Sequence, residues 1–144
     1  MSTDIGEDLM TRHFVVTADG GARSNPVGPA AYGAVVYENN EVVKEVGASI
    51  GIASNNVAEY QGLIAGLKAV NEIDPTATIL VKMDSKLVVE QMSGRWKVKH
   101  PNMQKLVKQA FATHDPTLVT YQWIPREENS HADSILNDVL DSGM

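Results

Sequence analysis

Short apolar runs alternate along the chain with segments in which apolar residues recur at helical spacing. The runs are too short for helices and are bounded by polar or turn-forming residues, which predicts five strands. They lie at residues 14–18, 31–37, 42–50, 78–83 and 118–123. The first run is apolar at almost every position, as is typical of a strand buried on both faces. Turn-forming residues fill positions 22–30 and 38–41, so a loop and a hairpin turn are expected there.

Apolar residues spaced three or four positions apart predict four helices. The longest follows Ser54-Asn55-Asn56, ends before Pro75 and carries a second face of small residues that would let it lie close to a sheet. The others are expected near residues 86–92, 101–114 and 129–141. Three early strands joined by short loops imply an antiparallel meander, and the later strand–helix alternation implies right-handed parallel crossovers.

The pattern therefore predicts an α/β fold. We expect a five-stranded mixed sheet, made of an antiparallel three-strand meander plus two parallel strands, with helices on both faces. A single domain would cover residues 12–142, after a polar leader at residues 1–11.

Composition narrows the class of protein. The chain has 144 residues, of which 43% are hydrophobic, and this suits one domain with one core. It has no cysteine, which excludes disulfides and thiolate metal sites. No apolar run approaches the ~20 residues that span a membrane. The first ten residues lack the basic and hydrophobic regions of a secretory signal, so a cytoplasmic location is expected.

Charge is unevenly distributed. The net charge of −6 and the pI of about 5.1 argue, as averages, against a nucleic-acid-binding protein. Residues 91–114, however, contain no Asp or Glu. This basic segment carries Arg95, Trp96, Lys97, Lys99, Lys105 and Lys108. It is either a solvated helix face or a surface that contacts phosphates.

Four carboxylates stand near the ends of predicted elements, and each has an ordinary explanation. Asp19-Gly20 suits a turn. Glu59 lies at capping-box spacing from Asn56. Asp84 precedes a helix that either it or Ser85 would cap, and Asp133, in a first helical turn, would interact favourably with the macrodipole.

The predicted topology brings these four side chains together. The strands that end at Asp19 and Asp84 are expected to be parallel neighbours roughly 4.8 Å apart, and helices that start at the same edge would carry Glu59 and Asp133 there. Crowded carboxylates repel one another unless cations bind them. An all-oxygen ligand set favours Mg²⁺ or Mn²⁺, and the four histidines show no zinc spacing. Two such ions would clamp the attacking and leaving oxygens in phosphodiester cleavage.

Four blocks of the sequence resemble type 1 ribonuclease H, a family that cleaves the RNA strand of RNA–DNA hybrids. The blocks are Asp19-Gly-Gly-Ala-Arg-Ser-Asn25-Pro, Asn55-Asn56-Val-Ala-Glu59, Asp84-Ser85 and Asn129-Ser-His-Ala-Asp133. They occur in the family's order, and the resemblance covers nearly everything from Phe14 to Asp141. It implies the same mixed sheet, an endonuclease that leaves 5′-phosphate ends, and two Mg²⁺ ions, with Mn²⁺ as a substitute, when substrate is bound.

The resemblance also implies a role for each matching residue. The metal-holding, catalytic set would be Asp19, Glu59, Asp84 and Asp133. The substrate contacts would be Gly20, Asn25, Ser54, Asn55, Asn56, Arg95, Trp96, Lys97 and Lys99. The asparagines would lie at the hybrid's minor groove, whose 2′-hydroxyls distinguish RNA from DNA, and Ser54 at a DNA-strand phosphate. Turn and cap chemistry is the alternative for these residues, and both roles can hold at once.

Three features depart from the family's pattern. Many members carry a histidine in a loop before the last helix, but residues 124–129 contain none, and His131 is the candidate to replace it in part. Val27 looks like an extra residue in the usual Asn-Pro-Gly-Pro run. The basic helix of some members is reduced to residues 95–99. This compact form is similar to archaeal and actinobacterial members, some of which are fused to a downstream phosphatase-like domain.

Three other functions are compatible with the sequence. One is a non-catalytic hybrid- or duplex-binding module. Another is a different nuclease of the same superfold, such as a 3′–5′ exonuclease, although those usually carry Asp-x-Glu where this chain has Asp19-Gly20-Gly21. The third is a metal-stabilised structural domain, which would give the basic segment no purpose. The expected partner is an RNA–DNA hybrid rather than a membrane, and the expected state is a monomer.

Overall fold

The computed structural model describes residues 10–24 and 26–142. Its strands are β1 (His13–Ala22), β2 (Val27–Glu38), β3 (Glu41–Ser54), β4 (Thr78–Met83) and β5 (Val119–Trp123). Its helices are α2 (Asn55–Ile73), α3 (Lys86–Met92), α4 (Pro101–Thr113) and α5 (Ser130–Ser142), with short 3₁₀ turns η1 (Pro116–Leu118) and η2 (Arg126–Glu128). Of the predicted leader, only Met10 and Thr11 are among the described residues. Within this part of the chain, no helix has the length and apolarity needed to cross a membrane.

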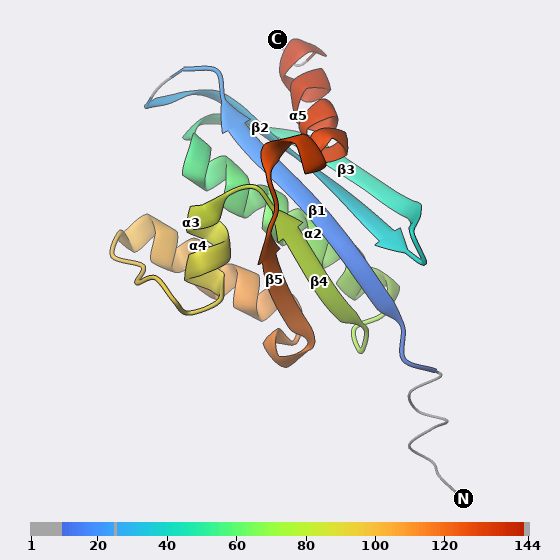
Figure 1. Ribbon diagram of the computed structural model, residues 1–144. Coiled ribbons are helices and arrows are strands. Elements are labelled where there is room, and N and C mark those ends of the chain that lie inside the picture. Colours follow the sequence, from blue (N-terminus) through green and yellow to red (C-terminus); the bar gives the residue numbers. More distant parts are fainter. Residues whose placement is uncertain (1–9, 25, 143–144) are drawn as a thin grey trace, which may run out of the picture.

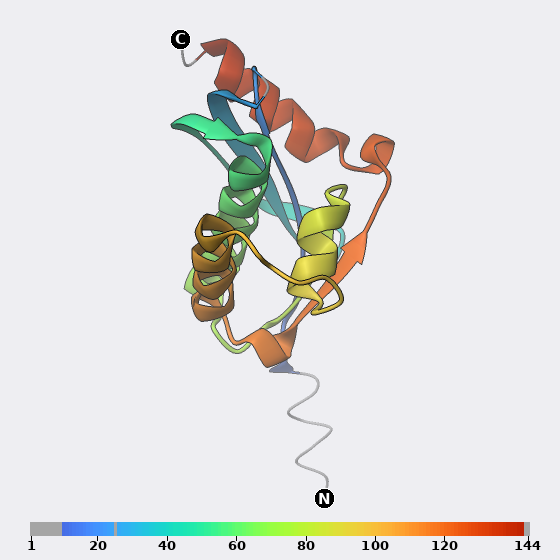
Figure 2. The same ribbon diagram turned by 90° about the vertical axis from the view of Figure 1, so that its left-hand side faces the viewer.

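The five strands form one mixed sheet in the order β3-β2-β1-β4-β5. β1, β2 and β3 pair antiparallel, whereas β4 pairs parallel with β1 and with β5. Figure 1 shows β1 in the middle of this sheet, and Figure 2 shows α2 and α4 on one face with α5 on the other. The predicted fold class is therefore confirmed.

The main core lies between the sheet and α2. Val16 of β1 and Tyr60, Leu63 and Leu67 of α2 are fully buried in it. The small-residue face of α2 allows close approach, because a Cβ atom at Gly66 would lie 2.5 Å from Cγ1 of Val16. This packing holds the middle of α2 against β1.

The hairpin between β2 and β3 turns at Asn39 and Asn40, whose φ angles are both positive (54° and 65°). Two successive left-handed residues match the strand twist, and asparagine tolerates this conformation. The predicted hairpin turn is confirmed.

The predicted loop at residues 22–30 is wrong in extent. β1 continues to Ala22 and β2 already begins at Val27, and the Arg23 N–H donates to the Pro29 carbonyl across the short connection (2.9 Å). β3 likewise runs past the expected end, with Gly51 at φ +78° beside a register shift. The turn-forming residues there are held in strands because a partner strand satisfies their backbone.

Candidate active site

Asp19 and Asp84 lie next to each other on parallel strands. Ala18 of β1 pairs with Met83, the last residue of β4. Asp19 is the next residue of β1, and Asp84 is the first residue after β4. Asp19 is only 8% exposed and accepts a hydrogen bond from the Gly20 N–H (2.9 Å). The expectation that Asp19 ends its strand is wrong, because β1 runs three residues further and pairs Asp19 with Gly33 of β2. Asp19-Gly20 is consequently not a turn.

Serine residues cap α2, the helix that carries Glu59, and α3, the helix that follows Asp84. Ser54 caps α2 by accepting from the Val57 N–H (3.2 Å), and Ser85 caps α3 by accepting from the Val88 N–H (3.3 Å). Glu59 is therefore not at a capping-box position, and Asp84 precedes the cap. Helix capping therefore does not explain either Glu59 or Asp84, and both carboxylates line the cavity.

Gly20 holds α2 against β1. A Cβ atom at this position would lie 2.2 Å from the Ala58 carbonyl carbon and 2.4 Å from the Glu59 nitrogen. No side chain fits there without moving the backbone. The structure therefore gives Gly20 a packing role that brings Glu59 to the edge of β1.

Asp133 reaches the same place from α5. Its N–H donates to the Asn129 carbonyl (3.1 Å), and its carboxylate accepts from the Asn137 side-chain amide one turn later (3.2 Å). α5 packs against β1, β2 and β3, so its first turn lies over the end of the sheet that carries Asp19.

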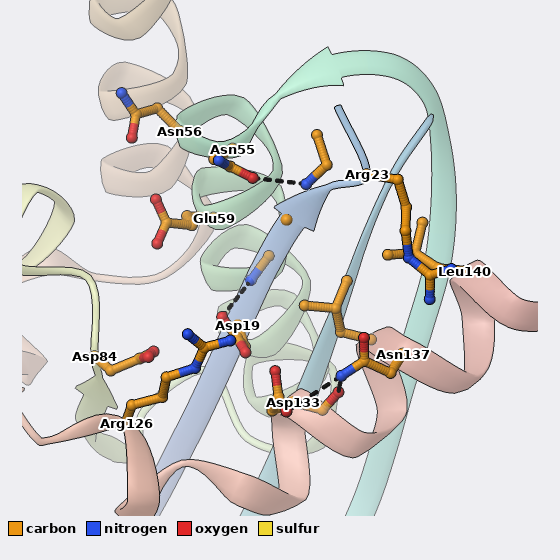
Figure 3. Close-up of a pocket in the computed structure, with 14 residues that line it drawn as sticks. Asp19, Arg23, Asn55, Asn56, Glu59, Asp84, Arg126, Asp133, Asn137 and Leu140 are labelled. Carbon is orange, nitrogen blue, oxygen red and sulfur yellow. Dashed lines mark hydrogen bonds between the residues drawn. The ribbon is translucent and has the colours of Figure 1, made fainter. Parts of the chain in front are cut away.

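One cavity of about 500 Å³ joins these elements. Figure 3 shows Asp19, Glu59, Asp84 and Asp133 around it, each from a different element. The cavity is lined by Asp19, Gly20, Gly21, Ala22, Arg23, Asn55, Asn56, Glu59, Asp84, Arg126, Asp133, Leu136, Asn137 and Leu140. In the described residues, no three acidic or histidine side chains are grouped closely enough to hold an ion by themselves. Further oxygens from water or substrate would have to complete any metal shell.

The crowding changes the proton affinity of the carboxylates. Burial, followed by the negative charge of Asp84, raises the pKa of Asp19 to about 8, and Asp133 and Glu59 act in the same direction. Burial also raises the pKa of Glu59 to about 7, with Asp84 adding to the effect and a hydrogen bond from Ser85 opposing it. Binding of a proton or a cation at this site reduces the repulsion between the carboxylates.

Arg126 is a cavity residue that sequence reasoning missed. Figure 3 shows its side chain reaching from the loop before α5 toward Asp19, between Asp84 and Asp133. Among the described residues it forms no ion pair. Arg126 could have been suspected from its position in the loop where many family members carry a histidine. The sequence alone, however, does not show which way its side chain points.

The predicted substrate contacts at the start of α2 and at Gly20 lie in two neighbouring cavities. Gly20, Asn55 and Asn56 line the carboxylate cavity, and Asn55 also accepts from the Ala22 N–H (2.7 Å), which ties α2 to β1. Ser54 lies with Asn56 in a second, neighbouring cavity of about 530 Å³. Asn25 lies outside the described residues.

The basic residues lie away from the carboxylate cavity, on the connection between α3 and α4. Lys97 and Lys99 are exposed, and Trp96 is 46% exposed. Arg95 instead pairs with Glu90, with 2.5 Å between Nε and Oε2. The lysines and the tryptophan are thus available to a large ligand, whereas the Arg95 charge is already partly neutralised.

His131 does not reach the cavity. Its ring pairs with Glu45 of β3 and packs edge-on against Tyr37, with ring centroids 6.4 Å apart. The structure therefore favours the alternative, a surface position on the first turn of α5, over a role as a replacement for the loop histidine.

Comparison with known proteins identifies relatives over most of this fold. A family model described as "Reverse transcriptase-like" matches residues 17–139. The "Bifunctional protein Rv2228c" of Mycobacterium tuberculosis is 52% identical over 131 residues, which is 89% of this chain but 35% of that protein. The chain thus spans about a third of the length of this curated relative.

Solved structures extend the comparison to the fold. The N-terminal RNase H domain of Rv2228c has a TM-score of 0.85 at 49% identity, covering 92% of this chain and 96% of that one. LC11-RNase H1, solved in complex with an RNA/DNA hybrid, has a TM-score of 0.83 at 34% identity, covering 90% and 98%. Taken with the sheet order and the four sequence blocks, these matches show that the chain belongs to the type 1 ribonuclease H family.

Proposed function

We propose that this protein is a metal-dependent endonuclease that hydrolyses the RNA strand of RNA–DNA hybrids and leaves 5′-phosphate ends. The observation that carries the proposal is the cavity around which β1, α2, the end of β4 and α5 each place one carboxylate. It lies beyond the end of β4 and beside β1, where open α/β sheets bind ligands. A relative of the same fold has been solved with a hybrid bound.

The donor set fits two hard cations. Asp19, Glu59, Asp84 and Asp133 offer only oxygen, which Mg²⁺ and Mn²⁺ prefer. Burial, together with the neighbouring negative charges, raises the pKa values of Asp19 and Glu59, and bound cations would favour the ionised carboxylates. When bound, such ions lower the pKa of the attacking water and offset the charge that develops on the phosphate.

The protein's own contribution is to position charged groups. Asp19 is fixed by the pairing of β1 with β2, Asp84 follows the last paired residue of β4, and Asp133 is held by the Asn137 amide. Arg126 reaches into the same space and has no ion-pair partner in the described residues, so it is free to contact a phosphate oxygen of the RNA strand.

Hybrid recognition would use polar residues near the carboxylates and the basic residues of the connection between α3 and α4. Asn55 and Asn56, together with Gly20 and Asn25, would lie at the minor groove, where 2′-hydroxyls mark the RNA strand. Ser54 would meet a phosphate of the DNA strand. Trp96, Lys97 and Lys99 would follow that strand away from the cavity.

The metal requirement tests this function directly. Cleavage of a hybrid is expected with Mg²⁺ or Mn²⁺ and should stop in excess chelator. Ca²⁺ should support binding but little cleavage, because its longer bonds and looser geometry do not suit the site. Full turnover in excess chelator would contradict the two-ion mechanism.

Charge removal tests the surface contacts. The double variant Lys97→Ala/Lys99→Ala is expected to weaken hybrid binding and to reduce the slope of log K against log salt by about one unit for each lost phosphate contact. Arg95→Ala should have a smaller effect, because Arg95 is already paired with Glu90.

A charge-matched control is available at a distant surface. Lys44 and Lys68 line a separate hollow beside Glu72, so Lys44→Ala/Lys68→Ala removes the same charge away from the cavity. Its salt slope should stay near that of the wild type. Equal slopes in both double variants would show that Lys97 and Lys99 form only a solvated face.

The alternative nuclease class finds no support in β1. An exonuclease-type Asp-x-Glu motif would place a second carboxylate at Gly21, which pairs with Ala31 and carries none. The variant Asp84→Asn separates the binding-module alternative from the enzyme.

We also propose that residues 12–142 act as one monomeric domain. The M. tuberculosis relative is named as bifunctional and extends far beyond the matched part. This supports fusion as one context for such a domain, and a phosphatase-like domain is the one that the sequence resemblance implies.

A further inference from the structure

Asn129 connects three of the four carboxylate-bearing elements. It lies between η2 and α5 and is only 1% exposed. Its side-chain nitrogen Nδ2 donates to the Ala18 carbonyl (2.9 Å), one residue before Asp19, and to Oδ1 of Asp84 (2.9 Å). Its own carbonyl accepts from the Asp133 N–H (3.1 Å). One buried residue thus joins β1, the end of β4 and the first turn of α5.

Helix capping does not explain this side chain. A capping asparagine accepts a hydrogen bond through its side-chain oxygen from an N–H in the first turn. In Asn129 that oxygen, Oδ1, is buried and has no hydrogen-bond partner among the described residues. Both contacts of Nδ2 are acceptors, so the amide cannot be reversed to satisfy Oδ1 without losing them. The orientation of the Asn129 amide is therefore set by the two hydrogen bonds that Nδ2 donates.

The backbone of Asp84 is held by the last residue of β5. The Trp123 indole Nε1 donates to the Asp84 carbonyl (3.2 Å), while Asn129 holds one carboxylate oxygen. Without the Asn129 contact, repulsion from Asp19 would favour rotation of the Asp84 carboxylate away from the cavity. The contact therefore keeps the Asp84 carboxylate pointing into the cavity, where a cation would bind, despite this repulsion.

We propose that Asn129 is a positioning residue that orients the Asp84 carboxylate for divalent-cation binding. The inference rests on the proposed metal-dependent function and adds a residue that does not itself touch the ion. Partners that hold a ligand in this way typically change metal affinity by about 10–100-fold when removed.

The test measures cation binding to the complete protein without substrate. Asn129→Ala is expected to raise the Mg²⁺ and Mn²⁺ concentrations that stabilise the protein against thermal unfolding by about 10–100-fold. The Mg²⁺ concentration for half-maximal cleavage should rise in parallel, while KM for the hybrid stays near the wild-type value. A merely structural role would lower the melting temperature without moving either metal midpoint.

Asn71→Ala is the matched control. Asn71 also uses its side-chain amide inside the fold, at 3.1 Å from Nδ1 of His114, and it lies roughly 18 Å along α2 from Glu59. This variant should lose thermal stability yet keep the wild-type metal midpoints. Asn129→Ser, which can donate to only one of the two acceptors, serves on the same criteria if the alanine variant does not fold.

The outcomes separate the inference from the proposed function. A wild-type metal response with unchanged midpoints in the folded Asn129 variant would overturn the positioning role and leave the enzyme proposal intact. Equal midpoint shifts in the Asn71 and Asn129 variants would also overturn it, because the effect would then follow stability. A wild-type protein with no metal response would overturn both proposals.

Discussion

Asp84→Asn is expected to abolish cleavage while leaving hybrid binding equal or tighter. The substitution keeps the side-chain shape but removes one of four crowded negative charges, so the protein should fold and repel phosphate less. Cleavage should fall by roughly a hundred- to a thousandfold, the loss that follows removal of one group from a preorganised charge-stabilising site. End-labelled hybrid measures the cleavage, and a filter or mobility-shift assay in Ca²⁺ measures the binding.

Asp138→Asn is the control for charge alone. Asp138 is exposed on α5, the helix that carries Asp133, and it does not line the cavity. This variant should cut at the wild-type rate. If Asp84→Asn also cut at that rate, Asp84 would have no part in the chemistry, and the binding-module alternative would gain support.

Asp19→Asn is expected to stabilise the metal-free protein at pH 8. The pKa of Asp19 is raised to about 8 and that of Glu59 to about 7, so the folded state holds protons that the unfolded state has released above about pH 4–5. Stability should therefore fall as pH rises from about 5 to 8. Removing the Asp19 charge should recover on the order of 1–3 kcal/mol at pH 8.

Chemical unfolding at several pH values measures this effect. Saturating Mg²⁺ should remove most of the decline in the wild type, because cations bind the ionised carboxylates. The carboxyls of Asp74 and Asp115, whose pKa values hydrogen bonds from threonine lower, contribute stability that is complete by about pH 5 and do not affect this window. A metal-free stability that rises between pH 5 and 8 would show that the pKa values of Asp19 and Glu59 are not raised in the folded protein.

The sequence was informative where local chemistry decides the structure. Apolar runs marked all five strands, and Asn39-Asn40 marked the hairpin. The convergence of four carboxylates followed from topology, because strand order and the starts of helices determine which residues share a sheet edge. Those predictions needed no knowledge of side-chain contacts.

Predictions from the local sequence were wrong where contacts with distant parts of the chain determine the structure. Asp19-Gly20-Gly21 is turn-like in composition, yet pairing with β2 keeps it in β1. Capping-box spacing suggested Asn56 as the cap of α2, whereas the end of β3 selects Ser54. Asn129 lies 111 residues from Ala18, so its role could not be recognised before the fold was known.

The proposed activity is tested most directly by mapping cuts on an end-labelled RNA–DNA hybrid with Mg²⁺, beside duplex DNA, duplex RNA and single-stranded RNA. The wild type should cut only the RNA strand of the hybrid, at internal positions, and leave 5′-phosphate ends. Binding of the hybrid without any cut would contradict the enzyme and favour a binding module. Equal cutting of single-stranded RNA would assign the chain to another kind of nuclease.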